Sequence, residues 1–262
     1  MKTEDAKKRA LPLPAGYRWS DISYVIGSAY KKARYIDLKG YIITATKDGS
    51  VLKTQYNLET GTWSEPGVQC EACHGPGSDH AKTTHKSSIT IDRSSAACGQ
   101  CHSRGTAELI PAKKGFIRHH EQYNEHTASP HKVLNCVTCH EPHTKYAFSI
   151  KNDCSTCHKK PTADYNGSAM QKIGVQCIDC HMPKATKSAT AQNIYQADIR
   201  THLFKINTSK NVDMFYKKKI KGKDKSFSRN FITLEFACIS CHKNKNIDWA
   251  SSSAKGIHTL GK

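Results

Sequence analysis

The feature that most constrains this sequence is a five-residue cysteine and histidine motif that occurs six times. The motif is Cys-x-x-Cys-His, and its copies begin at Cys70, Cys98, Cys136, Cys154, Cys177 and Cys238. Together they use all 12 cysteines of the chain. Because histidine makes up only 15 of 262 residues, its presence after six of six cysteine pairs is far beyond chance. One kind of chemistry therefore accounts for every cysteine.

Cysteine pairs with two residues between them occur in disulfides, in zinc knuckles and in covalent haem c attachment. Zinc sites built from two such pairs have no need of a histidine after each pair. Residues i, i+3 and i+4 share one face of a helical turn, so two thiols can bind a porphyrin while the histidine reaches its iron. The motif therefore predicts six haem c groups. It leaves no thiol for a structural disulfide or a catalytic cysteine.

The motif also assigns the residues of each site. The predicted covalent attachment residues are Cys70, Cys73, Cys98, Cys101, Cys136, Cys139, Cys154, Cys157, Cys177, Cys180, Cys238 and Cys241. The predicted proximal iron ligands are His74, His102, His140, His158, His181 and His242. No catalytic residue is predicted.

Nine further histidines could supply the second axial ligands. Six haems with two axial histidines each need twelve, and the chain has 15. A histidine close to a motif cannot easily reach the far face of the same porphyrin, so His131 and His143 are expected to serve neighbouring haems. The predicted distal ligands are His80, His120, His131, His143, His202 and His258. His119 remains an alternative to His120, and His85 and His126 are interpreted as surface residues.

Composition supports a core made largely of cofactor. Leu, Ile, Val and Phe make up 44 of 262 residues and the formal net charge is +18, values that alone suggest disorder. Six porphyrins would supply the missing apolar interior. For residues 66–262, a hexahaem cytochrome c domain, the short intervals between motifs predict a mostly irregular and α fold with little regular secondary structure. This fold class is that of a haem-packed multihaem cytochrome c.

Residues 1–65 are predicted to form a separate β-rich segment, either a cap over the first haem or a docking surface. β-branched and aromatic runs at residues 24–26, 34–37, 41–46 and 50–56 predict a small antiparallel β meander. Asp48-Gly49 between two of these runs is typical of a hairpin turn.

A basic stretch lies in the long interval before the last motif. Residues 215–225 are rich in lysine around an expected turn at Gly222, and residues 231–236 are expected to form a strand. A solvated hairpin is the ordinary interpretation. No nucleic-acid-binding motif is present and the haem propionates are nearer acidic partners, so nucleic-acid binding is not predicted.

The sequence predicts no transmembrane segment, because no window approaches eighteen consecutive apolar residues. Residues 1–14 have the charge of a signal n-region but no apolar h-region follows them. Haem c attachment takes place outside the cytoplasmic membrane. The expected location is therefore periplasmic or extracellular.

Three stretches resemble the multihaem cytochromes related to cytochrome c-554. They are Val68-Gln-Cys-Glu-Ala-Cys-His-Gly-Pro-Gly-Ser-Asp-His80, Ser129-Pro-His-Lys132 and Cys177-Ile-Asp-Cys-His-Met-Pro183. The resemblance covers most of residues 17–258 and implies a bis-histidine electron carrier, with the six distal ligands named above. In that group a further motif often follows the N-terminal meander, whereas here Trp63 runs almost directly to Cys70. A neighbouring molecule could complete the surroundings of the first haem.

These observations predict an electron-transfer protein rather than an enzyme. A carrier needs saturated irons, which the histidine surplus favours, whereas a reductase needs an open coordination position. No Cys-x-x-Cys-Lys variant marks a catalytic haem. The expected role is a subunit of an extracellular conducting filament, whose partners are other copies of the chain and redox proteins or extracellular electron acceptors. The alternatives are a monomeric periplasmic shuttle and a reductase of nitrite or hydroxylamine with one open haem.

Overall fold

The computed structural model divides the chain into two compact units, Met1–Ile91 and Asp92–Lys262. It describes residues 13, 15–26, 34–45, 51–57, 62–63, 68, 70–106, 108–144 and 148–259. The division follows Ile91, whereas the sequence suggested a boundary between residues 65 and 66. The first cysteine motif therefore lies in the first unit and the other five lie in the second.

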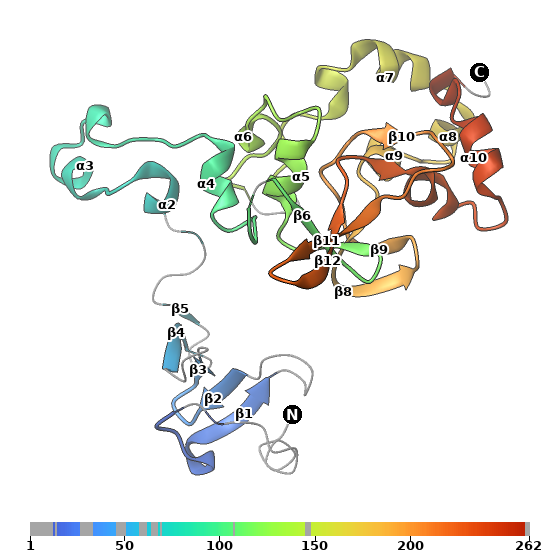
Figure 1. Cartoon of the computed structure of the whole chain (residues 1–262). Coiled ribbons are helices and arrows are strands. Elements are labelled where there is room, and N and C mark those ends of the chain that lie inside the picture. Colours follow the sequence, from blue (N-terminus) through green and yellow to red (C-terminus); the bar gives the residue numbers. More distant parts are fainter. Residues whose placement is uncertain are drawn as a thin grey trace. The chain divides into compact units, whose positions relative to one another are not determined.

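The first unit begins with an antiparallel meander, in blue in Figure 1, as the β-branched runs predict. Its elements in chain order are η1 (Trp19–Asp21), β1 (Ile22–Ile26), β2 (Arg34–Asp37), β3 (Tyr41–Ala45), β4 (Val51–Asn57) and β5 (Thr62–Trp63). Val25, Tyr35 and Ile43 are buried between the strands, and Trp19 packs edge-on against Tyr35. The expected turn at Asp48-Gly49 lies outside the described residues.

Short helices follow the meander around the first motif. They are α2 (Glu71–His74), α3 (Ser78–Thr83) and η2 (Lys86–Ser88). Gly75, with φ of 65°, ends α2. The Glu71 carboxylate accepts a hydrogen bond from the Gly77 backbone N–H at 2.7 Å, which closes the loop after the motif. Local hydrogen bonds of this kind stabilise the segment from Glu71 to Ser88, which has no buried residue.

The second unit combines short helices with a six-stranded sheet of order β11-β12-β6-β7-β8-β9. The strands of this sheet are β6 (Ile110–Lys113), β7 (Phe116–Arg118), β8 (Thr186–Asn193), β9 (Gln196–Ile199), β11 (Phe215–Ile220) and β12 (Lys223–Ser228). The β7–β8 pair is parallel and the other pairs are antiparallel. A small parallel pair joins β10 (Ile206–Asn207) to β13 (Ile232–Thr233).

The helices of the second unit are short and carry or flank the motifs. They are α4 (Ser95–Gly99), α5 (Gln122–Ala128), α6 (Cys136–Cys139), η4 (Cys154–Thr156), α7 (Lys159–Tyr165), α8 (Ala169–Lys172), α9 (Cys177–His181), the π-helix η5 (Glu235–Ile239), α10 (Ile247–Ser253) and η6 (Ile257–Thr259). Near the C-terminus, η6 packs against α7 (Figure 1).

One apolar core holds the sheet to its surroundings. Ile117 on β7, Leu203 and Ile232 are fully buried in it. Phe236 on η5 packs edge-on against Phe116 with ring centres 6.1 Å apart. This core joins the β6–β7 hairpin to the segments that precede the sixth motif.

The expectation of a mostly irregular and α fold fits only loosely, because the second unit is a mixture of helix and sheet. β8 has the sequence Thr-Lys-Ser-Ala-Thr-Ala-Gln-Asn and is largely exposed. Its sequence has no alternation of apolar and polar residues, so it did not predict a strand. Residues 231–236 were expected to form one strand. Only Ile232 and Thr233 of this stretch form a strand, β13, which pairs with β10, and the π-helix η5 begins at Glu235. The lysine-rich hairpin is present as β11 and β12, and Gly222 at its turn has φ of 74°.

No helix within the described residues combines the length and the apolar character that crossing a membrane requires.

The core position of Ile117 gives a test of the fold. Its side chain is 0% exposed, whereas Ile194 in the β8–β9 turn is 72% exposed. We expect Ile117→Ala to lower the free energy of unfolding by about 2–4 kcal/mol, because it removes buried methyl groups and leaves a cavity. Ile194→Ala is the matched control and should change it by less than about 0.5 kcal/mol. Urea unfolding followed by circular dichroism measures both, and equal effects would contradict this core.

Candidate functional site

Each Cys-x-x-Cys-His motif forms one helical turn. In five motifs the histidine backbone N–H donates to the carbonyl of the first cysteine, at 2.9 to 3.0 Å: His74 to Cys70, His102 to Cys98, His140 to Cys136, His158 to Cys154 and His242 to Cys238. The remaining motif forms α9. All twelve cysteines are described, and none is bonded to another or fully buried. The turn presents both thiols and the imidazole of one motif to one cofactor.

Caps set the start of several of these turns. Ser94 accepts from the Ala97 backbone N–H before the second motif, and Asp153 accepts from Thr156 at the fourth. At the fifth, the Gln176 backbone N–H donates to the Asp179 carboxylate at 2.8 Å. Polar side chains at helix starts stabilise such short turns by satisfying their free N–H groups.

Four motif histidines face a second histidine from elsewhere in the chain. The imidazole ring centres are 6.2 Å apart in His102–His120, 6.3 Å in His140–His202, 6.1 Å in His181–His258 and 5.7 Å in His158–His131. In the last pair the two Nε2 atoms are 3.4 Å apart. Four of the six predicted distal ligands are thus brought opposite motif histidines.

These separations fit a haem iron held between two imidazoles. Metal–nitrogen bonds of about 2.0 Å on both sides, added to imidazole radii of about 1.15 Å, place the ring centres about 6.3 Å apart. Three pairs lie within a few tenths of an ångström of that value, and the fourth is slightly closer. The residues present therefore fit the group that the motifs predict.

Two further features of these histidines suit iron ligation: the Nδ1 contact of His181 and the lowered pKa values of His202 and His131. His181 Nδ1 lies 2.9 Å from the Phe204 carbonyl oxygen, which directs Nε2 toward a metal. Burial lowers the pKa of His202 to about 4, and the nearby His140 adds to this effect. Burial also lowers the pKa of His131. Ligation requires the neutral imidazole, and the burial of His202 and His131 favours that form.

The other two predicted distal ligands have defined Nδ1 contacts. His80 Nδ1 is 3.0 Å from the His85 carbonyl oxygen, and His143 Nδ1 is 2.9 Å from the Glu141 carboxylate. Contacts of this type orient metal-binding histidines in proteins. His85 is exposed, as expected, whereas His126 is buried on α5 and is not the surface residue that the sequence suggested.

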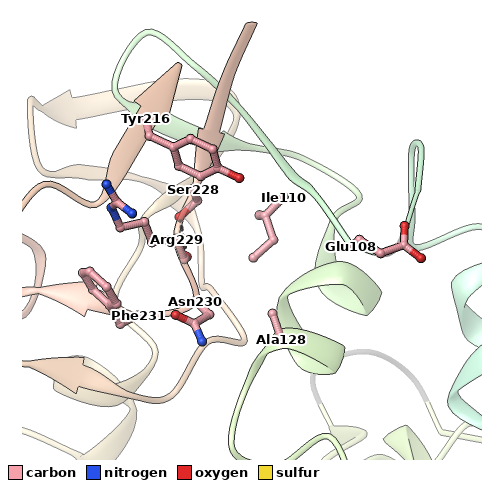
Figure 2. A pocket seen from close by; sticks show the side chains of 8 residues that line it. All are labelled: Glu108, Ile110, Ala128, Tyr216, Ser228, Arg229, Asn230 and Phe231. Carbon is pink, nitrogen blue, oxygen red and sulfur yellow. Dashed lines mark hydrogen bonds between the residues drawn. The ribbon is translucent and has the colours of Figure 1, made fainter. Parts of the chain in front are cut away.

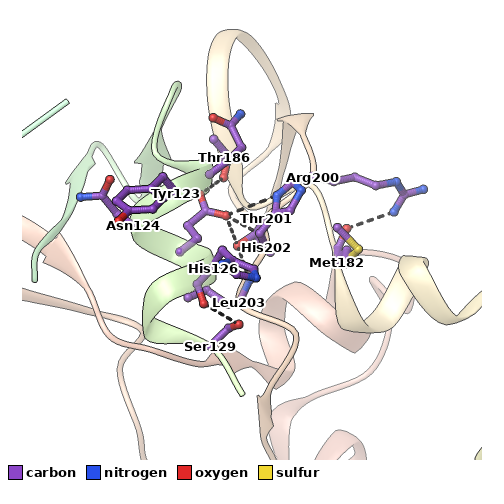
Figure 3. A network of polar contacts seen from close by, with 12 residues as sticks. Tyr123, Asn124, His126, Ser129, Met182, Thr186, Arg200, Thr201, His202 and Leu203 are labelled. Carbon is purple, nitrogen blue, oxygen red and sulfur yellow. Dashed lines mark hydrogen bonds and ion pairs between the residues drawn. The ribbon is translucent and has the colours of Figure 1, made fainter. Parts of the chain in front are cut away.

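Sequence reasoning missed the buried carboxylate that supports the His202 segment. Glu125 on α5 accepts hydrogen bonds from the Thr186 hydroxyl at 3.0 Å, the Thr201 hydroxyl at 2.8 Å and the His202 backbone N–H. Figure 3 labels the three partner residues. Burial raises the pKa of Glu125 to about 7. Three donors fix the backbone beside His202. An acidic residue on a short helix gives no sequence signal for this role.

Arg200 was also missed, and it ties the fifth motif to the strand that precedes His202. Its guanidinium donates to the Ile178 carbonyl at 2.8 Å, to the Met182 carbonyl at 3.1 Å and to the Asp179 carboxylate at 2.7 Å. It satisfies carbonyl groups at the end of α9, where a cation is favourable. The Met182 contact is visible in Figure 3.

The motifs of the second unit lie beside one another in chain order. The second and third are joined by a hydrogen bond from the Cys136 backbone N–H to the Ser95 hydroxyl, at 3.2 Å. At the third, burial and then the neighbouring Cys157 of the fourth raise the pKa of Cys139.

The same sequence of neighbours continues to the end of the chain. Burial, and after it the nearby Cys177, raise the pKa of Cys154, which links the fourth and fifth motifs. Burial, and after it Cys238, raise the pKa of Cys180 to about 11, which links the fifth and sixth. Helix α9 of the fifth motif also packs against η5 of the sixth.

A cavity of about 280 Å³ lies away from these motifs (Figure 2). Its lining residues are Glu108, Ile110, Ala128, Tyr216, Ser228, Arg229, Asn230 and Phe231. Neither a cysteine nor a histidine lines it, so it is not a haem-attachment site.

Comparisons with solved structures found two distant likenesses. The octahaem sulfite reductase MccA of Wolinella succinogenes matches with a TM-score of 0.48 and 22% identity, over 69% of this chain and 36% of that one. The outer cell wall cytochrome OcwA matches with a TM-score of 0.44 and 17% identity, over 96% of this chain and 80% of that one.

Sequence comparisons found one matching family model and one relative. The model for the N-terminal region of the NapC/NirT cytochrome c family matches residues 144–261, which contain the last three motifs. Multiheme cytochrome MtrA of Shewanella baltica is 27% identical over 143 residues, or 48% of this chain. The chain spans 39% of the length of that relative. These matches support a multihaem c-type cytochrome, the class of protein that the six motif turns and the four imidazole pairs also indicate.

Proposed function

We propose that this protein carries electrons along six haem c groups, each held by one Cys-x-x-Cys-His motif, with histidine as the second axial ligand wherever the chain presents one. The observation that carries the proposal is the set of four imidazole pairs with ring centres 5.7 to 6.3 Å apart. Haem c supplies an iron that alternates between ferric and ferrous forms and so carries one electron. His120, His131, His202 and His258 are the proposed distal ligands.

The proposed role of the polypeptide is to fix positions and to prevent other chemistry. Two axial imidazoles saturate an iron, so neither water nor a substrate binds it. Hydrogen bonds from other segments hold two of these imidazoles in place: the buried Glu125 fixes the backbone of His202, and the Phe204 carbonyl orients His181. Rigid ligands that change little between oxidation states favour electron transfer over catalysis.

The proposed route follows the order of the motifs in the second unit, from the second to the sixth. Its support is the hydrogen bond between Cys136 and Ser95, which joins the second and third motifs, and the packing of α9 against η5, which places the fifth motif beside the sixth. His80 and His143 are proposed, on the strength of their Nδ1 contacts, as distal ligands of haems other than the sixth, which includes haems of a neighbouring copy. The kinship with the cytochrome c-554 group, suggested by the motifs, remains a prediction.

Replacing one proposed distal ligand tests this assignment. We expect His202→Met to raise the reduction potential of one haem, because a methionine ligand favours the ferrous form. His85→Met is the matched control, since His85 is exposed. Spectroelectrochemical titration of both purified proteins measures the potentials, and intact mass confirms that each still carries six haems.

Two results would contradict the proposed ligand and the proposed haem count. A titration curve of His202→Met that superimposes on those of the wild type and of His85→Met would remove His202 from the ligand set. A mass below that of six haems in the wild type would contradict the hexahaem proposal itself.

We further propose an exported protein, periplasmic or extracellular, that assembles into a conducting filament and exchanges electrons with redox proteins or extracellular acceptors. The chain has 262 residues for six motifs, about 44 per motif, so haems would lie close to much of its surface. The first unit, with one motif of its own, could contact a neighbouring copy. A monomeric periplasmic shuttle and a reductase of nitrite or hydroxylamine are the alternatives.

Electron cryomicroscopy of the purified haem-loaded protein distinguishes the filament from the shuttle. The filament proposal predicts ordered fibres with a repeat set by one subunit. Discrete single particles across a range of concentration and ionic strength would remove the filament and leave the shuttle.

A further inference from the structure

We infer that the haem at the sixth motif has an exchangeable axial position that binds a small exogenous ligand. The inference rests on the proposed function, because it requires that a haem be attached at Cys238 and Cys241. It concerns the iron that His242 would bind from its proximal side. The ligand class is a small molecule with one donor atom, such as CO on ferrous iron or cyanide on ferric iron.

The main observation is the ring that contacts His242. That ring is the indole of Trp249 on α10, at a centre-to-centre distance of 4.7 Å and an interplanar angle of 52°. The distance is well short of the about 6.3 Å that an intervening iron requires. The indole therefore packs on the imidazole itself and does not occupy the place of a second axial ligand.

All 12 histidines of the second unit lie within the described residues, so its five motif histidines can be compared with one another. Four motif histidines have another imidazole 5.7 to 6.3 Å away. His242 has no histidine ring in contact with its own within this part of the chain. The same fold that sets four imidazole pairs at iron-binding separations places tryptophan against the fifth imidazole of the second unit.

The backbone conformation at the sixth motif also differs from that at the other motifs. Cys238 lies in the π-helix η5, where the Ser240 N–H donates to the Glu235 carbonyl at 2.8 Å, five residues back. π-Helical turns often occur at functional sites because they redirect side chains. Helix α10 is fixed by its cap, in which the Trp249 N–H donates to Asn246 at 2.9 Å. Trp249 is thus held in place by both its helix and its cap.

The surroundings of His242 admit small solutes. Cys241 is exposed, His242 is half-buried, and Lys243 and Lys245 are exposed. The Lys245 ammonium lies 5.8 Å from the centre of the Trp249 ring. Positive charge near an iron favours an anionic ligand on its ferric form. The site is therefore accessible and electrostatically suited to small anions as well as to CO.

Titration of the reduced, haem-loaded protein with CO tests the inference. We expect a CO-bound spectrum with a stoichiometry of about one per chain. A Cys238→Ala/Cys241→Ala variant should lose both one haem by intact mass and this CO binding. The matched control is Cys177→Ala/Cys180→Ala, which should lose one haem but keep CO binding, because His181 faces His258.

A milder variant covers the case in which loss of a haem prevents folding. Trp249→Ala should change the CO association rate several-fold with the haem count unchanged, whereas Trp19→Ala, in the first unit, should leave the rate as it is. No CO binding by the wild type, or binding that survives removal of the sixth motif, would overturn the inference. A wild-type mass without six haems would instead refute the proposed function.

Discussion

The separation between paired imidazoles is the constraint on which the rest of this structure depends. Each pair joins segments far apart in the chain, such as His140 with His202 and His181 with His258. Metal ligation between such segments closes long loops and couples cofactor binding to folding. A chain with few aliphatic residues can therefore reach a defined fold. The small apolar core around Ile117 and Leu203 is an addition to these links rather than a substitute for them.

The sheet and the polar network have one shared effect, which is to position the segment from β9 to Phe204. Arg200 holds α9, Glu125 holds the backbone of His202, and the Phe204 carbonyl orients His181. One short stretch thus contacts the third and fifth motifs. Phe204 also has φ of 59°, an uncommon value for a residue with a bulky side chain. Backbone in this region is held by its neighbours, as is usual where ligands must be placed with precision.

The sequence predicts the attachment sites directly, because covalent haem attachment imposes a fixed local spacing, and that assignment stays a prediction. His120, His131, His202 and His258 were expected as distal ligands and lie opposite motif histidines. The meander was predictable from its β-branched runs. β8 was not, since its polar, exposed sequence has no apolar alternation. Glu125 and Arg200 were equally hidden, because their roles arise only when distant segments meet.

The last motif of the second unit differs from the other four in the ring that contacts its histidine. We propose electron transfer at the four motif histidines that face a second imidazole, whereas His242, in the last motif, packs against Trp249. An experimental structure of the haem-loaded protein is the most direct test of the central claim that distant histidines ligate the irons in pairs. The account predicts that His120, His131, His202 and His258 each bind the iron of the motif histidine they face. Other axial ligands at those four irons would contradict it.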